Sequence, residues 1–202
     1  MPCGTEGIAL RNISKSYDGR FVLRDVSLTF AEGGRYCLTG PSGCGKTTLL
    51  HIVMGIVAPD SGTVTGMDGR AIAPVFQENR LCENLSAGTN LRIAARGKLK
   101  SGQAAEMLDR LLLPETLHKP VRTLSGGMKR RVAIARALLS GGGLLLFDEP
   151  FRELDEGTKA RVLDEVRREL SGKTLILVTH DPDEGARLGC EPIRFPAPAH
   201  RP

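Results

Sequence analysis

Nine consecutive residues have the types and the spacing needed to hold the phosphates of a nucleotide. They match the pattern G-x-x-x-x-G-K-[ST] at each fixed position and read Gly40-Pro41-Ser42-Gly43-Cys44-Gly45-Lys46-Thr47-Thr48. Glycines let the main chain turn its N–H groups toward a β-phosphate, Lys46 adds a positive charge, and the Thr47 hydroxyl can ligate Mg²⁺. The stretch predicts an anion-binding loop, but such a loop alone fits kinases, GTPases and motors alike.

The segments on either side of this loop decide whether the match is meaningful. Residues 35–39 read as a short buried strand, and residues 47–54 read as a helix whose positive end would face the phosphates. Cys44 lies inside the loop near that helix N-terminus, where a thiolate is favoured. We therefore expect either a reactive thiol that a bound nucleotide protects from alkylation, or a small buried residue.

Two further motifs carry chemistry. Asp148 and Glu149 follow the apolar run Leu144-Leu145-Leu146-Phe147, so they lie at the carboxyl end of a buried strand, where the ligands of open α/β sheets gather. Asp148 would organise Mg²⁺ and Glu149 could act as a general base. Ser125-Gly126-Gly127 begins an amphipathic helix; by itself this is an N-capped helix start that leaves main-chain N–H groups open to an anion.

Elements that could position these motifs alternate along the chain. Antiparallel edge strands are expected at 8–10 and 21–30, further strands at 63–65, 71–76, 144–147 and 174–179, and helices at 126–139 and 158–170. The apolar strands predict a mostly parallel sheet with helices on both faces. We expect one α/β domain over residues 1–190, with an inserted helical subdomain at about 81–140, and an extended tail at 191–202.

Composition narrows the class of protein. The 202 residues are 41% hydrophobic and carry a net charge of +5, which suits a globular domain and is too small an excess to argue for nucleic acid. The clusters Lys129-Arg130-Arg131 and Arg167-Arg168 read as solvated helix faces. Five scattered cysteines favour a reducing cytoplasm, and no apolar run approaches the roughly 20 residues that span a bilayer.

Taken together, these motifs resemble the ATP-binding subunit of an ATP-binding cassette (ABC) transporter, over residues 8–188. In that family a phosphate loop, a glutamine, a Leu-Ser-Gly-Gly signature, an aspartate-glutamate pair and a histidine occur in this order. The resemblance implies that Gln77 contacts Mg²⁺ and the attacking water, and that His180 lies near the γ-phosphate. It further implies that Tyr17 stacks on adenine and that Asp155 ends a loop facing a second subunit.

The resemblance also implies partners. Two copies would bind ATP head to tail, the phosphate loop of one facing Ser125-Gly126-Gly127 of the other. A permease subunit would dock on the region 81–123, where Leu81, Leu85 and Leu91 could form a groove. The segment from Asp148 resembles importers of nitrate, sulfonate or taurine, and thus implies a solute-binding protein and a place on the inner face of the membrane.

Alternatives stay open at this stage. They are an exporter ATPase, a non-transport ABC ATPase acting on nucleic acid or ribosomes, and a non-catalytic module that dimerises with ATP. The sequence departs from the family pattern at Met128, at Arg152-Glu153, at Gly141-Gly142-Gly143 and after Leu188. These departures bear on the rate and on dimer geometry.

Overall fold

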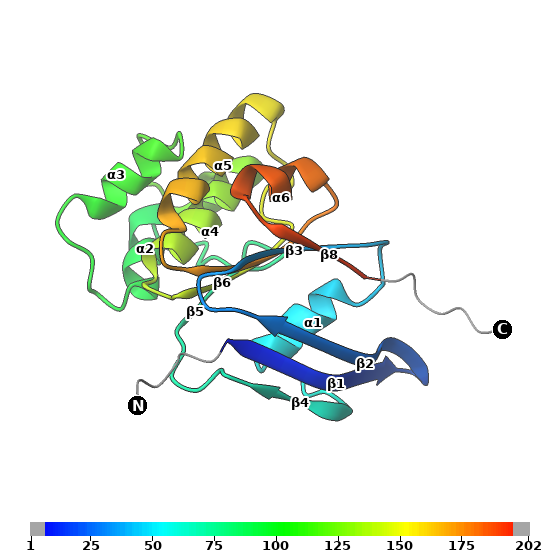
Figure 1. The fold of residues 1–202 in the computed structure, drawn as a ribbon. Helices are drawn as coiled ribbons and strands as arrows, with labels where there is room; N and C mark the ends of the chain where they lie inside the picture. Colours follow the sequence, from blue (N-terminus) through cyan, green and yellow to red (C-terminus); the bar gives the residue numbers. More distant parts are fainter. Residues whose placement is uncertain (1–6, 196–202) are drawn as a thin grey trace.

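The computed structural model describes residues 7–195 and has an α/β architecture built on two sheets (Figure 1). A five-stranded parallel sheet has the order β5-β6-β7-β3-β8, and a three-stranded antiparallel sheet has the order β2-β1-β4. The strands are β1 (Ile8–Tyr17), β2 (Arg20–Phe30), β3 (Arg35–Thr39), β4 (Ser61–Thr65), β5 (Ile72–Val75), β6 (Leu144–Asp148), β7 (Thr174–Val178) and β8 (Glu191–Arg194). The α/β class with an antiparallel edge sheet is confirmed.

Helices cover both faces of the parallel sheet. Helix α1 lies between the two sheets, and α4, α5 and α6 lie on the opposite face (Figure 1). Between β5 and β6 the chain forms α2, α3, the 3₁₀ turn η1 and α4. These elements are the helical insertion that the sequence predicts. The bounds are α1 (Lys46–Val53), α2 (Ala87–Ala94), α3 (Gln103–Arg110), η1 (Val121–Thr123), α4 (Gly126–Leu139), α5 (Glu156–Glu169) and α6 (Pro182–Leu188).

The alternation of side chains along the strands creates two cores. Leu144 and Leu146 of β6 pack toward α1, whereas Leu145 and Phe147 pack toward the helices of the other face. Successive side chains of a strand point to opposite faces, so a continuous apolar run serves both cores at once. This is why residues 144–147 are buried throughout.

The carboxyl-terminal segment differs from its expected extended tail. Residues 191–194 form β8, which pairs in parallel with β3 at the edge of the central sheet, and Phe195 is buried. Main-chain hydrogen bonds form this pairing, although the segment lacks the apolar run that would predict a strand. Pro192 is tolerated there because an edge strand leaves the main-chain groups on one side unpaired. Residues 196–202 of the expected tail lie outside the described residues.

Among residues 7–195, no helix has the length and apolar character required to cross a membrane.

Candidate functional site

A cavity of about 290 Å³ opens where the carboxyl ends of neighbouring strands meet. Gln77 follows β5, Asp148 ends β6 and Glu149 follows it. His180 follows β7, and the phosphate loop follows β3. Because β5, β6, β7 and β3 are adjacent and parallel, segments far apart in the chain meet at one edge. The residues that line the cavity are Tyr17, Val22, Ser42, Gly43, Gly45, Lys46, Thr47, Thr48, Gln77, Asp148, Glu149, Val178 and His180.

The phosphate loop has the backbone that its glycines predict. Gly43 and Gly45 have φ values of 77° and 100°, in the left-handed region that glycine adopts at little cost. A Cβ on Gly45 would lie 2.7 Å from the Val22 carbonyl oxygen, so this position also needs glycine for space. Gly45 is the N-cap of α1 and has no side chain to cap it, which leaves N–H groups available to an anion.

Lys46 reaches back over its own loop. Its Nζ donates to the carbonyl oxygens of Gly40 and Pro41 at 2.8 and 2.9 Å, and the residue is only 5% exposed. An ammonium held by neutral carbonyls is poised to exchange them for a phosphate oxygen, which is the stronger charge-assisted partner. Cys44 is 4% exposed, with its Sγ 3.6 Å from Lys46 Nζ, so the geometry favours the small buried residue over a reactive thiol.

Asp148 and Glu149 are both held in surroundings that oppose their charge. Burial raises the pKa of the Asp148 carboxyl, while a hydrogen bond with Thr47 and the charges of His51, Arg130 and Lys46 act in the opposite direction. Burial also raises the pKa of Glu149; the nearby His180 lowers it and Asp148 raises it further. A carboxylate that burial makes more basic is a better proton acceptor.

The backbone of Glu149 is unusual. Its φ is 48°, a left-handed conformation that is strained for a residue other than glycine, and its N–H donates to the Val178 carbonyl oxygen at 2.9 Å. Within residues 7–195 its Oε1 has no hydrogen-bond partner, and it lies 3.3 Å from His180 Nε2. The strained turn thus aims one unsatisfied carboxylate oxygen at the imidazole, beside the cavity.

Tyr17 stands at the outer end of the cavity. It ends β1, is 46% exposed, and has Lys15 Nζ 5.5 Å from its ring centroid. An exposed ring on the rim of a polar cavity offers a flat surface on which a base could stack.

Seven of the predicted nucleotide-binding residues do not line this cavity. Three of them, Gly40, Pro41 and Cys44, belong to the phosphate loop itself, and the other four lie on other segments of the chain. Ser125 caps α4 by accepting from Met128 N, and Asp155 caps α5 by accepting from Thr158 N. Gly126 and Gly127 pack against the segment before α5: a Cβ at Gly126 would lie 2.9 Å from Glu153 Oε2. The predicted N-cap role of Ser125 is confirmed, and these four residues gather at a second place on the same chain.

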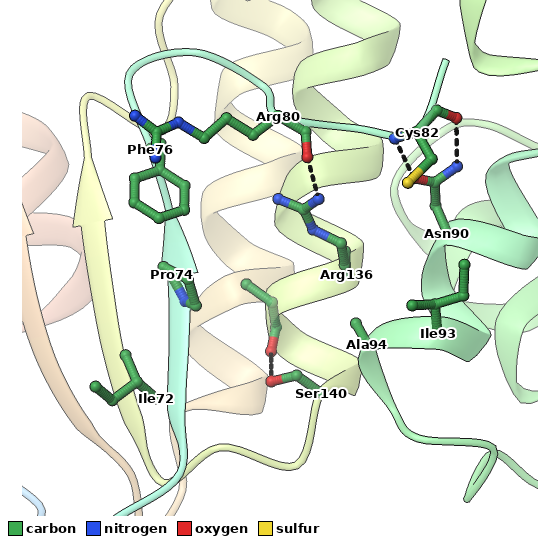
Figure 2. A pocket seen from close by; sticks show the side chains of 11 residues that line it. Ile72, Pro74, Phe76, Arg80, Cys82, Asn90, Ile93, Ala94, Arg136 and Ser140 are labelled. Carbon is green, nitrogen blue, oxygen red and sulfur yellow. Dashed lines mark hydrogen bonds between the residues drawn. The ribbon is translucent and has the colours of Figure 1, made fainter. Parts of the chain in front are cut away.

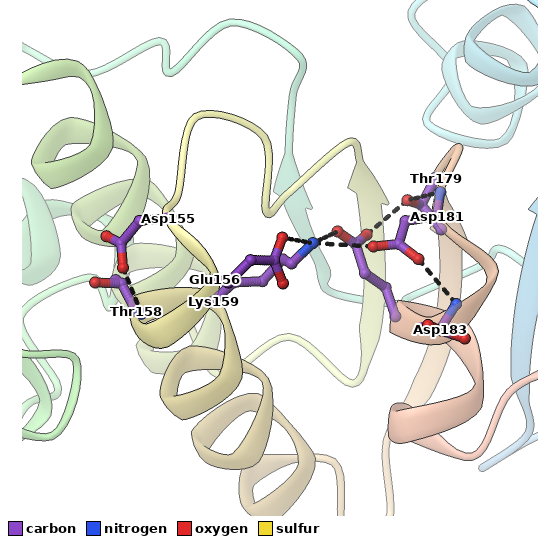
Figure 3. Close-up of polar contacts among 8 residues, drawn as sticks. Asp155, Glu156, Thr158, Lys159, Thr179, Asp181 and Asp183 are labelled. Atoms are coloured by element: carbon purple, nitrogen blue, oxygen red, sulfur yellow. Dashed lines mark hydrogen bonds and ion pairs between the residues drawn. The ribbon is translucent and has the colours of Figure 1, made fainter.

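A polar cluster that includes Thr179 and Asp181, the chain neighbours of His180, was not predicted from the sequence (Figure 3). Lys159 of α5 lies 2.9 Å from Asp181 and 3.0 Å from Glu156, and its Nζ is 3.8 Å from Glu184 Oε1. The Thr179 hydroxyl donates to Glu184 at 2.6 Å and accepts from Asp181 N. The cluster therefore ties the turn that carries His180 to the first turn of α5. Its members are scattered in sequence, so no local pattern could have revealed it.

The basic cluster at 129–131 is not the solvated helix face that we expected. Arg130 is 2% exposed and Lys129 and Arg131 are half-buried. The reason is that the acceptors of Arg130 are main-chain carbonyl groups of residues 76–77 and 148–150, which the fold brings to α4. Arg167 and Arg168 are exposed, as expected.

Comparisons with known proteins agree with this geometry. The family model described as ABC transporter matches residues 23–152. The chain is 42% identical over 203 residues to the aliphatic sulfonates import ATP-binding protein SsuB 2 of Burkholderia cenocepacia, covering 92% of this chain and 74% of that protein. It is 38% identical to the taurine import ATP-binding protein TauB of Jannaschia sp., covering 91% and 75%.

A third relative is longer. The chain is 37% identical to the molybdate/tungstate import ATP-binding protein WtpC of Pyrococcus horikoshii, and it spans 57% of that protein's length. Among solved structures, the dimeric post-hydrolysis state of the ATP-binding cassette MJ0796 bound to ADP and Pi superposes with a TM-score of 0.82 at 32% identity. That match covers 93% of this chain and 94% of the other. The chain therefore belongs to the ABC transporter family.

Proposed function

We propose that this chain is the ATP-binding and ATP-hydrolysing subunit of an ABC importer for a small solute. The observation that carries the proposal is the cavity at the carboxyl ends of four adjacent parallel strands, which brings Lys46, Asp148, Glu149 and His180 together. Phosphoryl transfer needs mainly positioning and electrostatic stabilisation, and this cavity offers both an anion cradle and a basic carboxylate.

The residues present fit an Mg²⁺ ion. The Thr47 hydroxyl and the Asp148 carboxylate are in hydrogen-bond contact, the Gln77 amide lies on the same cavity, and oxygen ligands of this kind suit Mg²⁺, which keeps several waters. We propose that Thr47 and Asp148 hold the ion, with Gln77 reaching it and the attacking water. When bound, Mg²⁺ would neutralise charge on the β- and γ-phosphates.

Residues of the chain would then perform the hydrolysis. Glycine N–H groups and Lys46 bind the β- and γ-phosphates, and Tyr17 stacks on the adenine. The Glu149 carboxylate accepts a proton from the attacking water, and His180, whose Nε2 is 3.3 Å from Glu149 Oε1, orients both the carboxylate and the γ-phosphate. The raised pKa of Glu149, caused chiefly by burial, strengthens it as the base.

A second copy would complete the site. Ser125, Gly126, Gly127 and Asp155 gather away from the cavity of their own chain, and the open N-terminus of α4 can bind an anion. We propose that this surface closes over the γ-phosphate bound by the partner, in a head-to-tail homodimer. A dimeric state of a related cassette with ADP and Pi supports this arrangement.

The permease would dock in a groove between β5 and α2 (Figure 2). The groove encloses about 350 Å³, and its apolar wall includes Ile72, Pro74, Phe76 and Ile93. Ile93 is 57% exposed, as a surface that awaits a partner would be. None of the three residues expected from the sequence, Leu81, Leu85 and Leu91, lines this groove. Leu91 is fully buried because it lies on the opposite side of α2 from Ile93. The occupant we propose is a short helix of the membrane subunit.

Import is favoured over export by the names of the relatives, which are ATP-binding proteins for sulfonate, taurine and molybdate or tungstate import. For an importer of this kind we further propose a solute-binding protein as a third component and a position on the inner face of the membrane. We propose that this chain does not contact nucleic acid directly.

Hydrolysis and docking are tested separately. The purified chain is expected to release phosphate from Mg-ATP, and Lys46→Ala to lack this activity. Ile93→Asp is expected to abolish co-purification with the permease encoded for the same transporter, whereas Ile56→Asp, at an equally exposed apolar residue outside the groove, should leave it intact. Absence of hydrolysis by the chain together with its permease would refute the enzyme assignment.

A further inference from the structure

Arg130 makes a set of contacts that the hydrolytic residues themselves do not explain. Its side chain is almost completely buried, and it projects from α4 between two segments of the active site. Its Nε donates to the Pro150 carbonyl oxygen at 2.9 Å, and its Nη2 donates to the carbonyl oxygens of Asp148, at 2.9 Å, and Glu149. One side of the guanidinium thus holds the turn that carries Glu149.

The other side of the guanidinium holds the segment that carries Gln77. Nη1 donates to the Phe76 carbonyl oxygen at 2.5 Å, and it lies 3.3 Å from both the Gln77 carbonyl oxygen and Asn79 Oδ1. All these partners are neutral oxygen atoms. A planar fork with five donors in fixed directions can hold two separate main chains at once, which a lysine ammonium cannot do.

The two segments need such support. Glu149 has a left-handed backbone with φ of 48°, and such conformations persist only where the surrounding structure enforces them. Gln77 is exposed and follows the short strand β5, so its own side chain is not fixed by packing. Burying a charged group among neutral acceptors is costly, and burial accordingly lowers the pKa of Arg130.

We propose that Arg130 is a positioning residue that sets the separation between the main chains of Gln77 and Glu149, and so the geometry around the attacking water. The proposal rests on the hydrolytic function proposed above. Because Arg130 projects from α4, the helix that Ser125 caps, it also links the surface that would meet the partner's ATP to Glu149, the base of its own site. A movement of α4 would therefore move the main chains of Gln77 and Glu149 as well, because Arg130 is hydrogen-bonded to both.

The test compares Arg130→Met, which keeps an unbranched stem but removes all donors, with Arg110→Met as a matched control. Arg110 on α3 pairs with the buried Glu165 at 2.8 Å and with Glu169. Its loss therefore also leaves a buried polar partner unpaired, but both partners lie on α5 and not in either segment. Arg130→Lys is the second variant if Arg130→Met does not fold. Hydrogen exchange over residues 76–80 and 148–153 is measured with kcat, KM and ATP affinity.

We expect exchange in both segments to rise at least about tenfold in the Arg130 variants and to stay unchanged there in Arg110→Met. We expect kcat to fall about 100-fold, the cost of misplacing a group by about 1 Å, while ATP affinity changes less than about threefold. Unchanged exchange in the two segments, or a kcat like that of the wild type, would overturn the proposal. If the wild-type chain does not hydrolyse ATP, the proposed function fails, whereas the exchange result still decides whether Arg130 holds the segments.

Discussion

Replacing Glu184 by glutamine is expected to stabilise the protein in mildly alkaline solution and to change little in acid. Glu184 is 6% exposed, accepts a hydrogen bond from Thr179, and lies 3.8 Å from Lys159 Nζ. Burial raises its pKa from 4.5 to about 7, and the charges of Asp181 and Glu149 add to this, while Thr179 and Lys159 act against it. The folded protein therefore binds this proton more tightly than the unfolded chain does.

The sign of the effect follows from that difference. Between pH 4.5 and about 7 the folded state holds more protons than the unfolded state, so the free energy of unfolding falls as pH rises through this window. The difference between the two pKa values, at about 1.4 kcal/mol for each pH unit, corresponds to roughly 3 kcal/mol lost by the wild type above the window. A glutamine carries no charge at either pH and escapes this loss.

Urea unfolding at about pH 5 and about pH 8 measures the effect. The variant should exceed the wild type by roughly 1 to 3 kcal/mol at the higher pH and by less than about 1 kcal/mol at the lower. Asp164→Asn is the matched control, because its ion pair with Arg187 is exposed and should contribute less than about 1 kcal/mol at both pH values. If Glu184→Gln is less stable than the wild type at the higher pH, the carboxylate is ionised and its pair with Lys159 stabilises the fold, contrary to this reasoning.

Three further predictions concern the nucleotide. Lys46→Ala should weaken ATP binding by at least about tenfold in a fluorescent-nucleotide titration, since a charge-assisted contact contributes about 1.5 to 3 kcal/mol; unchanged affinity would remove Lys46 from the phosphate site. Tyr17→Ala should weaken it about 5- to 150-fold, as loss of a stacking partner does, and Tyr17→Phe should restore it; if both variants bind equally, the ring does not stack. Gly45→Ala should destabilise the protein by at least about 1 kcal/mol in urea unfolding, because the Cβ would meet the Val22 carbonyl oxygen at 2.7 Å; a stable variant that binds ATP would contradict the loop geometry.

Local patterns predicted most of the elements that carry the site. The continuous apolar run at 144–147 gave a buried strand because both its faces are covered, and Gly45-Lys46 placed the loop at the start of α1. These features depend on neighbours in sequence. Within the strand expected at 21–30, alternation is a weaker guide. Val22, Val26, Leu28 and Phe30 share a parity, yet Leu23 is the buried residue near the turn, because irregular pairing shifts the register between β1 and β2.

Features that depend on distant parts of the chain could not be predicted. Strand β8 forms from an unremarkable segment because the edge of β3 is free to pair with it. Helix α2 has apolar residues on two sides, so the sequence could not tell that Leu91 faces the core and Ile93 the groove. Arg130 looked solvent-exposed because charge alone predicts exposure, whereas its partners are carbonyl groups about 20 and 54 residues away.

The association state of Glu149→Gln in the presence of ATP tests the central claim most directly. If Glu149 is the base and each site is completed by Ser125-Gly126-Gly127 of a second copy, this variant binds ATP without turning it over. Light scattering after size exclusion should then give a monomer without nucleotide and a stable dimer with Mg-ATP, and Lys46→Ala should remain monomeric in both. A Glu149→Gln protein that hydrolyses ATP at the wild-type rate, or that stays monomeric when saturated with ATP, would contradict the account.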